Sequence, residues 1–419
     1  MSMVPVVVTG LGPISAIGCG REDFWQALIS GQHGFGPITL CDVSFSPSRI
    51  GAEVKDFRLE SFVEGGRSIA RRAPRASQFA LAASALVFED SNIDLENCDR
   101  NRFGIIVGTS VGNMGEMFAS RDKWLAGGKA RPSSAFQMFH HSAACLLSSY
   151  FDLRGPIQTI SSGCNSGLDA IGQALRLIQT GLVDAVLVVG TDCELVPEII
   201  AALNASNSLS TRYNDNPGEA SRPFDLERDG NVVGEGAAAL LLEAESHANA
   251  RGAKCYARVG GYSVSAAGRH RRYNYKNPDL DLTPCVRALR GVIKEAGWQP
   301  EEVDLVNANG SSSVLYDKLE ASAYSVVFGK MFPEIRVHSI KSMLGQHGAG
   351  SSALQVVTAC LALEKGFVPP TINHENPDPA CGPIRIVTEK ECYRPQKVIV
   401  NSIGFGGFYY SCGAFTNMN

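Results

Sequence analysis

Short apolar runs that end at a glycine constrain the fold of this chain more than any other feature. Four of them recur along the sequence: residues 6–9 before Gly10, 104–107 before Gly108, 185–189 before Gly190, and 398–400 ahead of Gly404. Each run has the length and apolar content of a buried strand, and the glycine after it permits a sharp turn. The chain is therefore predicted to be an α/β protein.

Two apolar stripes with helical spacing follow strand-like segments and turns rich in Gly and Ser. The first consists of Leu168, Ile171, Leu175 and Ile178, and the second of Ala353, Leu354, Val357 and Leu361. Both stripes stop close to a glycine, Gly181 or Gly366, which is typical of a helix C-terminus. Segments 157–180 and 336–365 thus repeat one pattern. The repeat predicts two related halves, 1–255 and 256–419, packed around a shared centre.

Composition and charge exclude several classes of protein. Hydrophobic residues make up 44% of the 419 residues and charged residues 19%, which is ordinary for a soluble globular enzyme. A net charge of −4 gives no global basic field, so we expect no nucleic-acid partner. The N-terminus lacks a basic region followed by a long apolar run, and no uninterrupted stretch of about 18 apolar residues occurs. We therefore expect a cytoplasmic protein without a membrane span.

The twelve cysteines contain no C-x-x-C pair, and their spacing is irregular. This spacing is typical neither of a zinc site nor of a disulfide framework. We therefore expect reduced thiols and no bound metal. One cysteine has a distinctive setting. Cys164 lies between a strand and a helix that begins near Ser166, with Gly163 and Gly167 beside it. A helix N-terminus lowers a thiol pKa from about 8.5 and makes it nucleophilic. On spacing alone, a small buried cysteine in a tight turn is the alternative.

Five ordered groups of motifs extend the pattern around Cys164. They are VTGLG at 8–12, RGP at 154–156, the block with RPFD at 222–225, RDG at 228–230 and GEG at 234–236, KSM at 341–343, and NSIGFGG at 401–407. Over essentially its full length the chain resembles the β-ketoacyl-acyl-carrier-protein synthases of fatty-acid and type II polyketide assembly. The resemblance implies a five-layered α-β-α-β-α thiolase fold with two pseudo-symmetric halves, and Cys164 as the nucleophile. It also implies a homodimer, or a heterodimer with a second ketosynthase-like subunit.

The same resemblance implies a substrate and a carrier. The acyl group would arrive as a thioester on the phosphopantetheine arm of an acyl carrier protein, with no tightly bound cofactor. A basic segment, residues 269–276, is predicted to be a surface loop. It could meet an acidic carrier protein or be merely solvated.

The chain departs from the family at both catalytic histidines. Asn309 replaces the first, in Asn-Gly-Ser-Ser-Ser where the family has H-G-T-x-T, and Gln346 replaces the second. Neither amide titrates near neutral pH, although both can donate a hydrogen bond to a thioester oxygen. His347 follows Gln346 directly and is the alternative base, but adjacent side chains usually diverge.

Other positions keep the family pattern. Lys341 matches the lysine that supports the site electrostatically, and Asp317 and Glu320 match the acidic pair after the first histidine motif. Ser311 and Ser313 stand where threonines contact the pantetheine arm. Phe405 matches the gating aromatic residue, and its N–H with that of Cys164 would form the oxyanion hole. Bulky Phe408 and Tyr409 replace Thr-Asn in the next positions, so we expect an altered gate and pocket shape.

Three functions fit this pattern. The first is an acyl-transfer enzyme that loads Cys164 and completes an atypical condensation. The second is an acyltransferase or cyclase that loads Cys164 without decarboxylating malonate. The third is a partner subunit similar to a chain-length factor, which would shape the tunnel of an active synthase. Such partners generally lose the cysteine, so the retention of Cys164 favours the first two.

Overall fold

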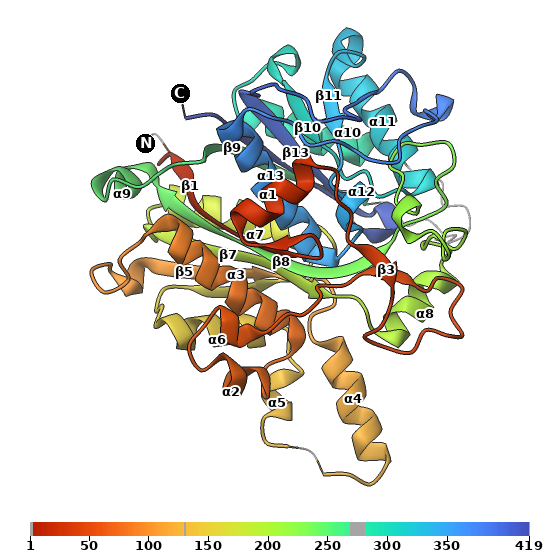
Figure 1. The fold of residues 1–419 in the computed structure, drawn as a ribbon. Coiled ribbons are helices and arrows are strands. Elements are labelled where there is room, and N and C mark those ends of the chain that lie inside the picture. Colours follow the sequence, from red (N-terminus) through yellow and green to blue (C-terminus); the bar gives the residue numbers. More distant parts are fainter. Residues whose placement is uncertain (1–2, 130, 269–280, 419) are drawn as a thin grey trace.

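The computed structural model describes residues 3–129, 131–268 and 281–418. The basic segment 269–276 lies outside the described residues, so its predicted role stays a prediction. Within these ranges the chain folds into strands and helices that alternate along the sequence, as predicted (Figure 1).

The strands of the first half form one continuous ladder in the order β6-β5-β7-β8-β1. Their bounds are β1 (Val6–Ser15), β5 (Phe103–Gly108), β6 (Ile157–Ile160), β7 (Ala185–Cys193) and β8 (Val233–Ala244). β5 runs parallel to β6 and β7, whereas β7, β8 and β1 are antiparallel neighbours. Short strands β2 (Gly18–Cys19), β3 (Phe35–Pro37) and β4 (Ile50–Ala52) attach at the side of β1 and β8.

The second half repeats this topology in the order β11-β10-β13-β14-β9, with β12 outside β11. Its strands are β9 (Ala257–Ala266), β10 (Leu305–Asn307), β11 (Arg336–His338), β12 (Arg385–Ile386), β13 (Lys397–Ile403) and β14 (Tyr409–Thr416). β10 is parallel to β11 and β13, and β13, β14 and β9 are antiparallel. The prediction of two pseudo-symmetric halves is therefore confirmed. Pairing of Val7 and Val8 with β9 joins the two ladders.

Two helices lie between the strands of the two halves. α7 (Ser166–Gln179) follows β6, and α13 (Gly348–Lys365) follows β11, which are equivalent places in the repeat. They pack on each other and on strands of both halves. The contact requires Gly167, since a Cβ there would lie 2.2 Å from the carbonyl oxygen of Ala349. Residues 348–363 of α13 are all buried, as expected for a helix that is covered on every side.

The outer layers complete a five-layered arrangement. α3 (Arg75–Ser91) and α6 (Ser142–Phe151) cover the first half, and α10 (Thr283–Glu295) and α11 (Val314–Phe328) cover the second. The remaining helices are α1 (Arg21–Ile29), α2 (Gly66–Ala70), α4 (Met114–Leu125), α5 (Ser134–Gln137), α8 (Pro197–Ala205), α9 (Glu245–Ala250) and α12 (Lys341–Leu344). Figure 1 shows α4 and α5 extending away from the body. Among the described residues, no helix combines the length and apolar content needed to cross a membrane.

Two of the four glycines do not end their strands, which corrects the sequence-based expectation. β1 continues past Gly10, and β7 continues past Gly190. A Cβ at Gly10 would meet the carbonyl oxygen of Val87 in α3 at 2.9 Å, and one at Gly190 would meet that of Ala349 at 2.6 Å. These glycines admit a close helix instead of a turn.

Candidate active site

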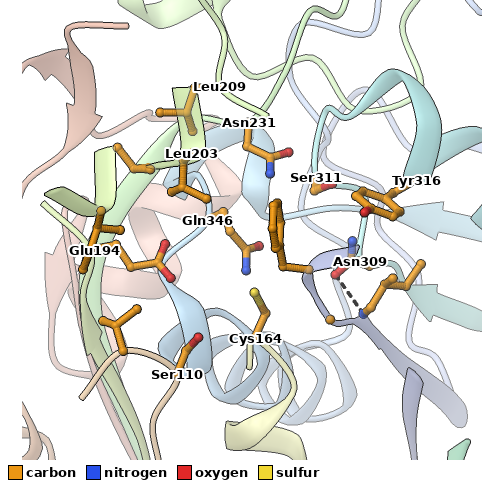
Figure 2. A pocket seen from close by; sticks show the side chains of 16 residues that line it. Ser110, Cys164, Glu194, Leu203, Leu209, Asn231, Asn309, Ser311, Tyr316 and Gln346 are labelled. Carbon is orange, nitrogen blue, oxygen red and sulfur yellow. Dashed lines mark hydrogen bonds between the residues drawn. The ribbon is translucent and has the colours of Figure 1, made fainter. Parts of the chain in front are cut away.

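One pocket of about 180 Å³ contains the candidate nucleophile and several groups that the sequence singled out. It is lined by Ser110, Val111, Cys164, Glu194, Ile199, Leu203, Leu209, Asn231, Val233, Asn309, Ser311, Tyr316, Gln346, Ile403, Gly404 and Phe405. Figure 2 shows Cys164 and Gln346 near the centre, Glu194 on one side and Asn309 on the other. Residues from both halves of the chain therefore meet in one place.

Cys164 is presented by the tight turn between β6 and α7. Gly163 adopts φ +77°, a conformation that residues with a Cβ rarely adopt. The Ser166 hydroxyl donates to the carbonyl oxygen of Gly163 at 2.6 Å, and the Ser352 hydroxyl of α13 donates to that of Cys164 at 2.9 Å. The amide of Asn165 donates to Ser411 and accepts from Ser402. These bonds fix the cysteine against both halves.

The expected lowering of the Cys164 pKa is wrong. Burial and, after it, the negative charge of Glu194 raise the pKa of this thiol to about 12. A hydrogen bond from the backbone N–H of Phe405 and the positive charge of Lys341 lower the pKa, but by less. The position at the start of α7 does not compensate for removal from water, because a helix dipole contributes only about 1 kcal/mol. At neutral pH the group is therefore a thiol.

Asn309 lines the pocket, and hydrogen bonds hold its side chain in place. Its Oδ1 accepts hydrogen bonds from Lys341 Nζ at 3.2 Å and from the backbone N–H of Ile403 at 3.1 Å. Lys341 Nζ also donates to the Asn309 carbonyl oxygen and to Gln355 Oε1, at 2.6 and 3.3 Å. Since the oxygen of the side-chain amide is occupied, its NH₂ group is the part that can bind a substrate oxygen.

Lys341 itself is buried, with a side chain that ends among three acceptors. Burial lowers its pKa to about 8, although the carboxyl groups of Glu320 and Asp317 and the Cys164 thiol raise it. It does not line the pocket, so its predicted electrostatic support acts through Asn309 and at a distance on Cys164.

The acidic pair is fully buried and organises the loop that carries Asn309. Glu320 accepts from the backbone N–H groups of Asn309 and Gly310, at 2.7 and 2.8 Å. Asp317 accepts from the N–H of Ser311 at 3.0 Å. Burial raises the pKa of both carboxyl groups, that of Asp317 to about 7. The two carboxyl groups therefore fix the loop backbone that carries Asn309, which agrees with a positioning role.

Gln346 lines the pocket, whereas His347 does not. The backbone of Gln346 forms hydrogen bonds with Val232 and Gly234, and no residue that the structure describes bonds to its buried Oε1. The His347 ring is also buried and lies against Gly236 and Gly350. Burial lowers its pKa to about 3, so this imidazole is neutral. The structure thus places the alternative base outside the pocket.

The two candidate pantetheine-binding serines, Ser311 and Ser313, have different surroundings. Ser311 lines the pocket, and its buried hydroxyl has no hydrogen-bond partner within the described part of the chain. Ser313 instead is the N-cap of α11, where its hydroxyl accepts from the N–H of Tyr316. Only Ser311 lies where a substrate in the pocket would meet it.

Phe405 lines the pocket and its side chain is 43% exposed, as expected of a residue at an entrance. Phe408 and Tyr409 do not line it. The carbonyl oxygen of Tyr409 accepts from the Asn165 amide, which supports the cysteine turn. Neither side chain of this bulky pair therefore contributes to the pocket lining, and the expected change in the gate and pocket shape stays a prediction.

Sequence reasoning missed Glu194, Asn231, Ser110 and Tyr316. Glu194 had a usable signal, since it stands in a polar stretch at the carboxyl end of the β7 run, where α/β proteins commonly place site residues. Asn231 and Tyr316 come from loop and helix positions with no such signal. Across the described residues, no group of three or more His, Cys, Asp or Glu side chains is arranged to hold a metal ion.

The layered fold, the repeated halves and a cysteine at the start of a central helix define a thiolase-fold protein. Family models agree with this geometry. Residues 3–248 match the model of the beta-ketoacyl synthase N-terminal domain, and residues 256–375 match that of the C-terminal domain. The chain belongs to the β-ketoacyl synthase family.

Individual relatives are similar over nearly their whole length. The chain is 36% identical to 3-oxoacyl-[acyl-carrier-protein] synthase 2 of Synechocystis sp., covering 96% of this chain and 95% of the relative. It is 37% identical to the protein of the same name from Coxiella burnetii, covering 96% of both.

Solved structures show the same fold. A chain of a type II PKS acyl-carrier protein in complex with its ketosynthase bound to the hexaketide aligns with a TM-score of 0.90 at 29% identity. A chain of the ishigamide ketosynthase/chain length factor also has a TM-score of 0.90 at 29% identity. Both alignments cover 100% of each chain.

Proposed function

We propose that this protein is a ketosynthase-like acyltransferase that takes an acyl group from an acyl-carrier-protein thioester onto Cys164. The transfer would serve specialised fatty-acid or polyketide biosynthesis and end in an atypical condensation. One observation supports the proposal: Cys164 shares its pocket with two amide side chains, those of Asn309 and Gln346. The sequence resemblance implies histidines at these two positions in other members of the family.

The pocket has the parts needed for loading. The backbone N–H of Phe405 reaches the Cys164 sulfur, so it lies where the oxygen of a thioester would become negative during attack. The NH₂ of Asn309 and the amide of Gln346 can bind a carbonyl oxygen. An apolar wall formed by Ile199, Leu203 and Leu209 can cover an acyl chain.

The pocket offers fewer groups that could assist decarboxylation of malonate than groups that could assist loading of Cys164. Asn309 and Gln346 can polarise a thioester, but neither can accept or donate a proton as an acid or base. His347 is outside the pocket and neutral. We therefore propose slow decarboxylative condensation, with transfer to a different nucleophile as the second candidate.

The carrier and the subunit partner follow from the same proposal. The phosphopantetheine arm would enter past Phe405 and meet the free hydroxyl of Ser311. The similar structures include an acyl carrier protein bound to its ketosynthase and a ketosynthase with a chain length factor. We propose a cytoplasmic dimer, formed with a second copy or with a ketosynthase-like subunit.

Intact-mass analysis after incubation with acyl and malonyl carrier proteins tests the proposal. We expect the wild type to gain one acyl group, with peptide mapping placing it on Cys164, and we expect Cys164→Ala to gain none. Cys392 is exposed, so Cys392→Ser serves as a control for nonspecific acylation and should load normally. A wild type that stays unmodified across a broad acyl panel, while Cys164 reacts with alkylating reagents, would favour a partner-subunit role instead.

A further inference from the structure

Glu194 is the unexplained group of this pocket. It directly follows β7, its residue is 6% exposed, and it is the only carboxyl group among the described residues that line the pocket. In Figure 2 the carboxyl group points into the pocket, on the side facing Gln346 and Cys164. A buried carboxyl group is costly unless it has partners or a function.

Its neighbour Asp192 shows the contrast. Asp192 accepts hydrogen bonds from Thr109 Oγ1 and from four backbone N–H groups, including those of Ser110 and Ala349. These bonds explain Asp192 as a structural anion. No hydrogen bond from a described residue stabilises the Glu194 carboxyl group. Burial raises its pKa well above 4.5, and the negative charge of Asp192 adds to this rise. Glu194 therefore has no comparable structural reason to lie there.

Loading of Cys164 requires a proton acceptor. The thiol pKa of about 12 means that the attacking sulfur carries a proton at neutral pH. The amides of Asn309 and Gln346 cannot take that proton, and His347 does not line the pocket. A carboxyl group with a raised pKa is suited to the task, because a base works best when its pKa lies near the ambient pH.

We propose that Glu194 transfers the proton during acylation of Cys164. The carboxylate accepts the proton from Sγ as Sγ bonds to the thioester carbonyl carbon. The bond between that carbon and the pantetheine sulfur breaks, and Glu194 returns the proton to the departing sulfur. The exchange consumes no net proton and involves no oxidation. This inference rests on the proposed loading of Cys164.

The groups around Glu194 define its pH response. Asp192 faces it from β7 and Cys164 from the turn before α7, while Lys341 of α12 acts on Cys164. The side chains that α8 contributes to the pocket, Ile199 and Leu203, are uncharged. Repulsion from Asp192 keeps the Glu194 proton bound to higher pH, so the loading rate should rise as pH rises through the Glu194 pKa.

Two possible roles of Glu194 predict opposite effects of Glu194→Gln. As a mere negative charge, Glu194 hinders thiolate formation, so removing it should accelerate every reaction of Cys164. As the proton acceptor, its removal should slow acyl transfer. Two rates are therefore measured on the same variant: single-turnover loading from acyl carrier protein, and alkylation by iodoacetamide, which needs only the thiolate.

We expect Glu194→Gln to load about 10²- to 10⁴-fold more slowly, with a flattened pH profile, while alkylation becomes faster. Glu194→Asp, which keeps a displaced carboxylate, should load at an intermediate rate and retain the rise with pH. Glu198→Gln is the matched control on α8, outside the pocket lining, and should match the wild type in both assays. Thermal melting of each variant verifies the fold.

Each outcome decides one question. If the wild type is not loaded, the proposed function fails, whatever the variants do. If the wild type is loaded and Glu194→Gln loads equally fast or faster with the wild-type pH profile, the proton-transfer role is overturned and loading stands. If loading and alkylation slow together, Glu194 only shapes the turn, and the inference is also wrong.

Discussion

Lys341 Nζ donates a hydrogen bond to Asn309 Oδ1 over 3.2 Å, which fixes the Asn309 side-chain amide at the pocket. Gln355 of α13 extends the connection, because its Nε2 donates to the carbonyl oxygens of Ala308 and Asn401. The Asn309 amide is therefore held in place by a buried network of polar groups. Such a network preorganises a donor for a substrate oxygen even though it provides no base.

Restoring both histidines should raise decarboxylation. We expect Asn309→His with Gln346→His to increase carbon dioxide release from malonyl carrier protein by about 10²-fold or more, since general acid–base help is worth about 10²- to 10⁴-fold. Each single variant should gain less, because the two groups bind the same thioester. Release is measured for the wild type and all three variants. Wild-type release at the rate of an ordinary ketosynthase would contradict the role assigned to the two amides.

Removing the Lys341 charge should make Cys164 less reactive. Lys341 lowers the pKa of the thiol, so Lys341→Met should slow alkylation at about pH 7 by roughly 3-fold or more, with each pKa unit changing the thiolate fraction tenfold. Three buried acceptors also lose one hydrogen bond each, so the melting temperature should fall. Lys397→Met, which removes a lysine paired with Glu302 at the surface, is the control. Equal alkylation rates would show that Lys341 does not act on the thiol.

The buried His338 should destabilise the fold at mildly acidic pH. Neither ring nitrogen has a hydrogen-bond partner among the described residues, and burial lowers the pKa of His338 from 6.5 to about 3. Below 6.5 the unfolded chain takes up a proton that the folded chain does not, so stability present above that pH is lost as pH falls toward 3. The loss is roughly 1 kcal/mol per pH unit.

We expect His338→Leu to remove this share of the pH dependence in urea unfolding measured between about pH 7.5 and 5.5. His141→Gln, at an exposed position, should leave the slope as it is. A His338→Leu slope identical to that of the wild type would mean that His338 is protonated in the folded state.

Adding one methyl group at Gly167 should separate the two central helices. A Cβ there would lie 2.2 Å from the carbonyl oxygen of Ala349 and 2.8 Å from Ser352 Oγ, so backbone must move. We expect Gly167→Ala to lose about 3 kcal/mol of unfolding free energy, at the upper end of overpacking. Gly36→Ala, where nothing lies within 4 Å, is the matched control and should cost far less. Similar losses for both variants would refute the close contact.

Much of the fold and part of the site were predictable from the sequence. The apolar runs at 104–107 and 185–189 are strands, and the stripes at Leu168 and Leu354 are central helices, because periodicity reports which faces are buried. The ordered motifs identified the family, and they placed Cys164, Asn309, Gln346, Ser311 and Phe405 in what proved to be one pocket. Their catalytic roles remain predictions.

The tertiary structure alone decided the protonation of the site. The sequence places Cys164 at a helix start and predicts an acidic thiol, but burial and the Glu194 carboxylate raise its pKa, and both depend on segments distant in the chain. The tertiary structure also decided the role of His347. Gln346 lines the pocket, whereas the His347 ring packs against Gly236 and Gly350. Sequence patterns record which residues are buried. Desolvation and charge interactions depend on distances in space, which only the packed halves establish.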